Sequence, residues 1–286
     1  MAASTAALCG ITKQYKDFTL GPVDMTVPAG SIVGLIGENG AGKTTLLKIL
    51  CGVNRADDGT VDLLGGSPAD AATRAKIGVV FEDAFFYGSF TAAQVARSLA
   101  GMYGARWNAD SFSAYLRRFG LDAGKKLKEY SRGMRLKLSL AAALAHDPEL
   151  LVLDEATAGL DPVVRGELLD LFLEFIQDER HSIVMSSHIT ADLEQIADSI
   201  AYLHNGQLLF QENKDDLLQE YGVLHCGEDV LPSLPAGLVV FTRRGAYGCE
   251  SLVRERRTVQ ELLPEAVCDA ARLDDIMRFY SGRDAQ

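Results

Sequence analysis

Four short runs of almost uninterrupted apolar residues recur along the chain. They cover residues 32–36, 77–81, 150–153 and 183–185. A strand that is apolar on both faces is typical of a parallel sheet, because helices cover such a sheet on each side. The runs therefore predict the central strands of a parallel sheet.

Apolar residues at helical spacing separate these strands. They recur at 46–50, through much of 91–145, and in a helix that begins after Asp161 and runs through Phe175. Two shorter strands around a turn at Lys16–Asp17 predict an antiparallel edge. We therefore expect a doubly wound α/β core of the phosphate-loop ATPase class, with an antiparallel β edge and a helical insert.

The pattern changes towards the end of the chain. Residues 238–242 and 249–253 alternate like strands around Gly245, and an amphipathic helix follows at 273–280. This indicates a small α+β appendage. The expected division is an ATPase domain at 1–221, with its helical insert at about 84–147, and an accessory domain at 222–286.

Composition narrows the class of protein. The 286 residues carry a formal net charge of -11, which argues against a general nucleic-acid binder. The five cysteines are scattered without C-x-x-C spacing, as expected for a reduced, cytosolic chain without a zinc site. No apolar run reaches the roughly 18 residues of a membrane span. If the protein works at a membrane, another chain is expected to provide the span.

The stretch from Gly37 to Thr45 carries the most specific chemistry. It fits the phosphate-binding loop G-x-x-x-x-G-K-[ST], between an apolar strand and a helix. Its glycines let successive N–H groups point at phosphate oxygens, and the helix adds the positive end of its dipole. Lys43 supplies a charge for the β- and γ-phosphates, and the Thr44 hydroxyl can bind Mg²⁺. The nucleotide-binding residues predicted in this loop are Gly37, Glu38, Asn39, Gly40, Ala41, Gly42, Lys43, Thr44 and Thr45.

Two acids follow the run at 150–153, at the carboxyl end of a buried strand where ligands bind α/β sheets. Asp154 suits holding Mg²⁺ through water, and Glu155 suits positioning and deprotonating an attacking water. His188 ends the next strand at the same edge, where a site role and an ordinary structural role are both open.

Three further positions have both a local and a functional interpretation. Tyr15 is either a plain strand residue or an aromatic platform for a base. Ser131 is a natural N-cap, and with Gly133 it also forms a second helix end suited to phosphate. Asp161 before Pro162 is locally explained as the N-cap of the next helix.

Taken in their order along the chain, the motifs between Leu8 and Gln211 resemble those of the nucleotide-binding subunit of an ATP-binding cassette (ABC) transporter. The Ser131–Met134 stretch is similar to the family's signature, which other phosphate-loop ATPases lack. Tyr130 to Met134 and the Asp-Glu-Ala-Thr stretch most resemble exporters of the ABC-2, bacitracin-resistance type. The resemblance implies that Tyr15 stacks on adenine, that Asp161 belongs to the D-loop, and that His188 is the catalytic switch histidine.

The sequence departs from the family's pattern at a few positions, and the resemblance also implies cofactors and partner proteins. Glu82 stands where the family has a Gln that contacts Mg²⁺, and Arg132 and Met134 replace the signature's first glycine and last Gln. Family resemblance implies ATP and Mg²⁺ as cofactors and a head-to-tail pair of cassettes, as homo- or heterodimer. It further implies a separate membrane permease that holds the protein at the cytoplasmic face of the cell membrane. The alternative is an ABC-type ATPase acting on ribosomes or DNA.

Overall fold

The computed structural model describes residues 4–81, 86–245 and 248–282. It divides into two compact units. The first comprises residues 1–188 and 201–210, and the second comprises 189–200 and 211–286. The expected boundary between an ATPase domain at 1–221 and an accessory domain at 222–286 stays a prediction.

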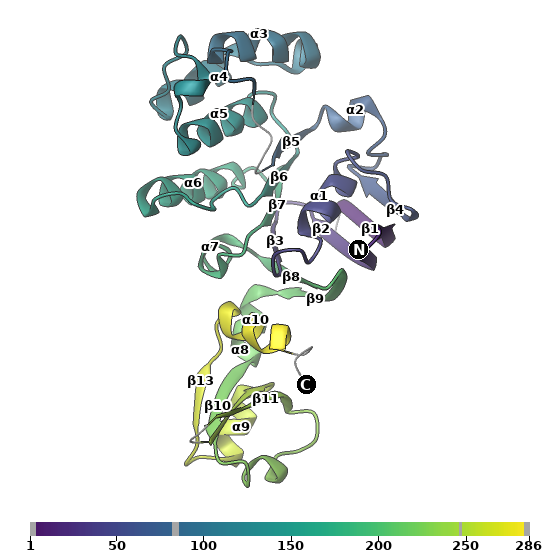
Figure 1. Ribbon diagram of the computed structural model, residues 1–286, viewed down its shortest axis with the longest axis vertical. Helices are drawn as coiled ribbons and strands as arrows, with labels where there is room; N and C mark the ends of the chain where they lie inside the picture. Colours follow the sequence, from purple (N-terminus) through teal and green to yellow (C-terminus); the bar gives the residue numbers. More distant parts are fainter. Residues whose placement is uncertain (1–3, 82–85, 246–247, 283–286) are drawn as a thin grey trace. The chain divides into compact units, whose positions relative to one another are not determined.

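A six-stranded sheet forms the centre of the first unit (Figure 1). Every residue of β3, β6 and β7 is buried, as expected for strands covered on both faces. The pairs β5–β6, β6–β7 and β3–β7 are parallel, which confirms the predicted α/β core. The strands, in sheet order, are β5 (Ile77–Val80), β6 (Leu150–Asp154), β7 (Ser182–Ser186), β3 (Ile32–Ile36), β8 (Ser199–His204) and β9 (Gln207–Asn213).

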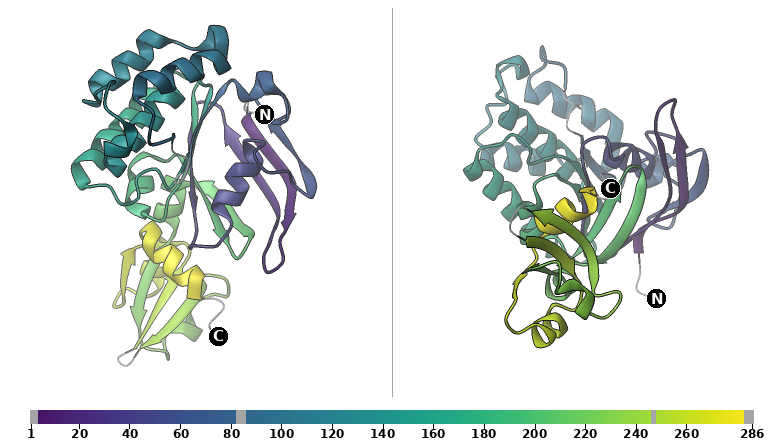
Figure 2. Two further views of the ribbon diagram at one scale, coloured as in Figure 1. Left: turned by 45° about the horizontal axis from the view of Figure 1, so that its top comes forward. Right: turned by 60° about the horizontal axis from the view of Figure 1, so that its bottom comes forward.

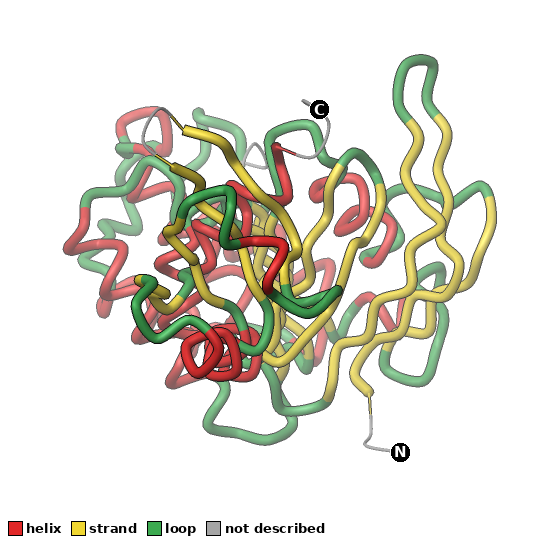
Figure 3. The backbone as a smooth tube through the Cα atoms, turned by 90° about the horizontal axis from the view of Figure 1, so that it is seen from below, coloured by secondary structure: helices red, strands yellow, loops and turns green. Residues whose placement is uncertain are grey.

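A second, three-stranded antiparallel sheet forms the predicted β edge. Its order is β2 (Thr19–Pro28), β1 (Ser4–Gln14) and β4 (Asp58–Leu63). Figure 3 shows β1 and β2 as two long strands joined by a tight loop, starting at the N-terminus. Helix α1 (Lys43–Leu50) packs its apolar face into one core with residues of both sheets, among them Leu8, Val33 and Val152. This core fixes the loop that precedes α1.

The helical insert contains α3 (Ala92–Tyr103), α4 (Ala109–Arg118) and α5 (Arg132–Leu144), which Figure 2 shows grouped together. Its core includes Val95, Phe112 and Leu138. Local sequence sets the helix starts: Thr91 and Gln94 form a capping box, and the Ser131 side chain accepts from Met134 N. The remaining short elements of the first unit are α2 (Ala71–Arg74), η1 (Gly104–Arg106) and η2 (Leu127–Glu129).

Two ion pairs join the insert to α6 (Pro162–Phe175), the helix capped by Asp161 as predicted. Arg118 of α4 makes two hydrogen bonds to the Glu174 carboxylate, at 2.6 and 2.9 Å. This guanidinium holds the pKa of the Glu174 carboxyl below its usual value. Lys137 of α5 lies 2.8 Å from Glu167. All four side chains belong to the first unit.

The second unit is built on a four-stranded antiparallel sheet in the order β11-β12-β10-β13. The predicted strands and final helix of the appendage are present as β11, β12 and α10. Leu224, Val253 and Val259 belong to its core. Its elements are α7 (Thr190–Ile196), α8 (Lys214–Glu220), β10 (Gly222–Cys226), η3 (Leu231–Ser233), β11 (Val239–Gly245), β12 (Gly248–Val253), α9 (Arg256–Leu262), β13 (Val267–Ala270) and α10 (Leu273–Ser281). Within the described ranges, none of the helices has the length and apolar character needed to cross a membrane.

Candidate active site

The loop between β3 and α1 can be built only with glycine at its turning points. Gly40 and Gly42 have φ values of 86° and 107°, a region that other residues rarely adopt. A Cβ atom at Gly37 would collide with the carbonyl oxygen of Leu203. Position 42 is tight as well, because a Cβ there would lie 2.9 Å from the Phe18 ring. The loop therefore keeps its backbone close to neighbouring elements at both ends.

Lys43 lies at the first turn of α1 and is buried, with 6% of its surface exposed. Its ammonium donates to the carbonyl oxygens of Gly37, at 2.8 Å, and Glu38, at 3.2 Å. It also lies 3.3 Å from Glu155 Oε1. The charge is thus held inside the loop and against the carboxylate at the end of β6.

Asp154 is fixed at both carboxylate oxygens. Oδ2 accepts from the Thr44 hydroxyl at 2.8 Å, and Oδ1 accepts from the Ser186 hydroxyl at 2.6 Å. Mg²⁺ prefers hard oxygen donors, and it is usually held by one or two carboxylates together with phosphates and water. The adjacent oxygens of Thr44 and Asp154 fit this requirement. Ser186 was not predicted, although it lies in the polar end of the strand that precedes His188.

Glu155 follows with a strained backbone, at a φ of 52°. Its N–H donates to the Ser186 side chain at 3.0 Å, which fixes the turn after β6. Oε2 accepts from the backbone N–H of His188 at 3.3 Å, and the ring Nδ1 of His188 lies 2.6 Å away. Oε1 is buried, and apart from the ion pair with Lys43 at 3.3 Å it has no hydrogen-bond partner among the described residues. This oxygen can therefore accept from a bound water.

These groups meet at one cavity of about 240 Å³. The phosphate loop forms most of its wall, Glu155 closes one side, and Phe18 closes another. Phe18 was missed because nothing in its local sequence indicates that the β1–β2 turn faces the loop. The lining residues are Phe18, Glu38, Asn39, Gly40, Gly42, Lys43, Thr44, Thr45 and Glu155. Gly37 and Ala41 belong to the same loop, and Asp154 joins it through Thr44.

Other predicted residues lie outside the lining of this cavity in the described chain. Tyr15 is 43% exposed at the tip of the β1–β2 hairpin, where its hydroxyl accepts from Asn54 at 3.4 Å. Ser131 and Gly133 lie at the start of α5, and Asp161 lies at the start of α6. Their predicted roles in binding nucleotide stay predictions. Glu82 lies outside the described residues.

The starts of α5 and α6 adjoin each other within this chain. A Cβ at Gly133 would contact Leu160 at 3.6 Å, and a Cβ at Gly159 would lie 3.2 Å from the Arg132 guanidinium. The departure from the family's signature at Arg132 therefore places a long cation over a glycine of the predicted D-loop. The residues of the predicted signature and of the predicted D-loop are therefore neighbours within this chain.

Comparison with known proteins agrees with this geometry. The family model described as ABC transporter matches residues 20–158, which include the phosphate loop, Ser131 and Glu155. The bacitracin transport ATP-binding protein BcrA of Enterococcus faecalis is 36% identical over 212 residues, covering 72% of this chain and 68% of that protein. The chain belongs to the ABC transporter ATP-binding proteins.

Two more comparisons extend this result. An uncharacterized ABC transporter ATP-binding protein of Synechocystis is 38% identical, over 70% of this chain and 58% of its own length. A solved ATP-binding subunit of an ABC transporter matches with a TM-score of 0.68 at 28% identity, covering 75% of this chain and 92% of that one. The predicted family and fold class are confirmed. The chain spans 58%, 68% and 66% of the lengths of three curated relatives.

The two interpretations of Ser131 in this ABC protein can be separated by substitution. Ser131 accepts from Met134 N at 3.2 Å, so Ser131→Ala should destabilise the fold by about 1 kcal/mol through loss of the N-cap. Asp caps as well as Ser, but its charge repels phosphate. We expect Ser131→Asp to keep the wild-type melting temperature and to lose ATPase activity. Equal activity of Ser131→Asp and wild type, measured at saturating ATP, would leave only the capping role.

Proposed function

We propose that this ABC protein binds ATP with Mg²⁺ in the cavity of the phosphate loop, hydrolyses it, and drives a separate membrane permease that works as an exporter. The observation that carries the proposal is the buried contact of Lys43 with Glu155, since it joins the phosphate loop to the carboxylate suited to activate water. BcrA, a named transport protein among the relatives, supports the export class. Purified protein should hydrolyse ATP slowly alone and faster with its permease.

Each residue of the cavity has a chemical task in this proposal. Loop N–H groups and Lys43 bind the phosphates, and Lys43 exchanges part of its carbonyl contacts for phosphate oxygens. Thr44 and Asp154 would hold Mg²⁺, which supplies charge neutralisation for the phosphates. Glu155 orients the attacking water and takes up its proton at Oε1. His188 holds the other oxygen of Glu155 and so fixes the carboxylate plane.

A second cassette completes the proposed site. The surface at the starts of α5 and α6, which carries Ser131, Gly133 and Asp161, is not part of the lining of their own cavity. The α5 start offers backbone N–H groups and a positive dipole end suited to phosphate. We therefore assign this surface to the ATP held by a partner cassette, with Tyr15 stacking on the adenine from the cavity side. Residues 1–221 act as the ATPase domain in this scheme, and 222–286 act as an accessory domain.

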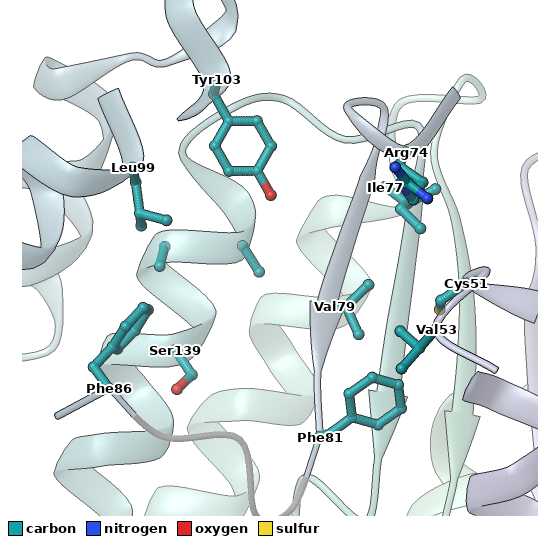
Figure 4. A pocket seen from close by; sticks show the side chains of 12 residues that line it. Cys51, Val53, Arg74, Ile77, Val79, Phe81, Phe86, Leu99, Tyr103 and Ser139 are labelled. Atoms are coloured by element: carbon teal, nitrogen blue, oxygen red, sulfur yellow. The ribbon is translucent and has the colours of Figure 1, made fainter. Parts of the chain in front are cut away.

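The permease is assigned to a cavity of about 340 Å³ between the central sheet and the helical insert. Figure 4 shows Leu99, Tyr103 and Phe86 on the side of the insert, facing Val79, Phe81 and Val53 across it. An apolar cleft next to a helix bundle suits a short amphipathic helix. Phe86 lines this cavity, and Tyr87, the next residue along the chain, is 79% exposed. Docking there would place the protein at the cytoplasmic face of the membrane.

Site-directed cross-linking tests this docking. We expect Phe86→Cys to cross-link to a cysteine in a cytoplasmic loop of a candidate permease, when the two are co-expressed. Val267→Cys, on β13 of the second unit, is the matched control. A Cys9→Ser background removes an exposed native thiol. Burial raises the pKa of the Cys51 thiol in the same cavity to about 12, so that thiol stays protonated and unreactive. Cross-links formed only by Val267→Cys would place the permease on the second unit instead.

A further inference from the structure

Two free cysteines of the second unit lie against each other on the two inner strands of its sheet. Cys226 is the last residue of β10, and Cys249 is the second residue of β12. The register of these antiparallel strands places the two residues directly opposite each other. Their Sγ atoms lie 3.7 Å apart. The strand pairing itself therefore brings the two thiols together.

The geometry of this pair suits a covalent bond between the sulfurs. Residues directly opposite on antiparallel strands have Cα atoms about 4.5 or 5.5 Å apart, depending on their backbone hydrogen bonds. Disulfides span Cα separations of about 4.4–6.8 Å, so both spacings are suitable. Cys226 is partly exposed, whereas Cys249 is buried, with 4% of its surface exposed. A small reagent can therefore reach Cys226 first, and Cys249 is placed to react next.

We propose that Cys226 and Cys249 form a reversible oxidation site that reacts with low-molecular-weight disulfides such as oxidised glutathione. The Cys226 thiol loses its proton, and the thiolate attacks one sulfur of the reagent, which releases the other half of the reagent as a thiol. The Cys249 thiol then loses its proton, attacks the Cys226 sulfur of the mixed disulfide and releases the second half as a thiol. Two electrons pass from the protein to the reagent, so one disulfide forms as another is reduced. The inference does not depend on ATP.

The surroundings of Cys226 make this reaction slow at neutral pH. Burial, the neighbouring Cys249 thiol and the charge of Asp229 together raise the pKa of the Cys226 thiol to about 11. Only the thiolate attacks, and its fraction rises about tenfold with each pH unit below that pKa. The pair therefore stays reduced through a brief exposure and responds to a sustained oxidising environment, a behaviour typical of sensing disulfides in reducing compartments.

The bond would close a loop that contains η3 and β11. Both elements lie between the two cysteines, which are 23 residues apart. A disulfide across such a loop reduces the freedom of the unfolded segment and so disfavours its opening. Local unfolding of β11 and β12 should therefore be rarer in the oxidised protein, and hydrogen exchange of their amides should be at least about tenfold slower. Oxidation would thus stiffen the second unit.

The alternative explanation is that two small side chains merely pack together. Cys249 Sγ donates to the Cys226 carbonyl oxygen at 3.2 Å, a contact that needs no redox chemistry. Cys268 provides the comparison, because it is a buried cysteine of the same sheet whose sulfur lies beside Gly222, at the other end of β10. A packing role predicts that Cys226 and Cys249 resist oxidation as Cys268 does.

Peptide mapping separates the two explanations. Reduced full-length protein is treated with oxidised glutathione at about pH 8.5, where the thiolate fraction is raised, then denatured, alkylated and digested with trypsin. Cleavage after Arg243 and Arg244 separates the two cysteines, so a pair of joined peptides identifies the bond. We expect this pair in the wild type, its loss on adding dithiothreitol, and formation about tenfold slower one pH unit lower.

Two variants complete the experiment. Cys268→Ser is the matched control and should form the bond as the wild type does. Cys249→Ser should stop at the mixed disulfide, with glutathione retained on Cys226, and its hydrogen exchange should stay at the rate of the reduced protein.

Several results would overturn the inference. They are complete alkylation of Cys226 and Cys249 in treated wild type, glutathione retained on Cys226 without an internal bond, or joined peptides that contain Cys268. Equal hydrogen exchange of the oxidised and reduced forms would reject the stiffening of the second unit. Each of these measurements is made without nucleotide, so their failure would leave the proposed function untouched, and absence of ATP hydrolysis would leave this oxidation site untouched.

Discussion

A Glu155→Gln variant will bind ATP with Mg²⁺ and hydrolyse it at least about 100-fold more slowly than wild type, the lower range for loss of a general base. Glutamine matches the shape of glutamate, and its amide oxygen can still accept from the His188 N–H in the place of Glu155 Oε2. It cannot take a proton from water, and it removes the negative partner of Lys43. Lys43 is then freer to bind phosphate, so ATP affinity should hold or rise. The trapped nucleotide should hold two cassettes together.

Single-turnover hydrolysis and gel filtration with ATP measure both effects. Glu149→Gln is the matched control. Glu149 is a partly exposed acid that directly precedes β6, whereas Glu155 follows that strand, and Glu149 pairs with Lys76 at 3.3 Å. It should leave turnover unchanged. Wild-type-like turnover in purified Glu155→Gln protein would remove Glu155 from the catalytic role and shift attention to other acids near the cavity.

Lys43→Ala should fail in a different way, by losing affinity for the nucleotide. Lys43 is buried, and its ammonium already points into the loop that receives the phosphates. A hydrogen bond to a charged group contributes about 1.5–3 kcal/mol, so we expect ATP to bind about 10- to 100-fold more weakly. Tripolyphosphate should lose affinity to the same extent, because the lost contact involves only phosphate.

Equilibrium titration with a fluorescent nucleotide measures this loss. Lys13→Ala serves as the control. Lys13 lies in β1 and pairs with Asp57 at 2.6 Å, and neither residue lines the cavity of the phosphate loop. Circular dichroism should confirm that both variants fold. If Lys43→Ala bound ATP as tightly as Lys13→Ala, the loop backbone alone would account for phosphate binding.

The sequence predicts those parts of the protein that depend on local chemistry. Strands such as β3 and β6 are apolar throughout because both their faces are buried, and the glycines of the phosphate loop stand where only glycine fits. Helix starts follow the same logic, since Ser131 and Asp161 each accept a backbone N–H within their own turn. These features leave a recognisable pattern in the local sequence, even where a distant residue such as Leu203 sets the constraint.

Features that depend on distant segments were not predicted. Phe18 reaches the cavity only because the β1–β2 hairpin turns its tip towards α1, which begins 25 residues further along the chain. Ser186 orients Asp154 across a spacing of 32 residues. The short elements α7 to α9 carry few residues each, so their apolar pattern is too brief to separate helix from strand. Grouping of α7 with the second unit also depends on its contact with α10.

The attachment of the helical insert to α6 has a consequence for the choice of buffer. Arg118–Glu174 and Lys137–Glu167 are ion pairs with at least one exposed partner each, and dissolved ions screen such pairs over about 8 Å at physiological ionic strength. Raising the salt concentration should therefore loosen these tethers while the buried contacts of Lys43 and Asp154 persist. ATPase rates measured at low and at high salt would then come from molecules whose helical inserts are attached to α6 with different strength.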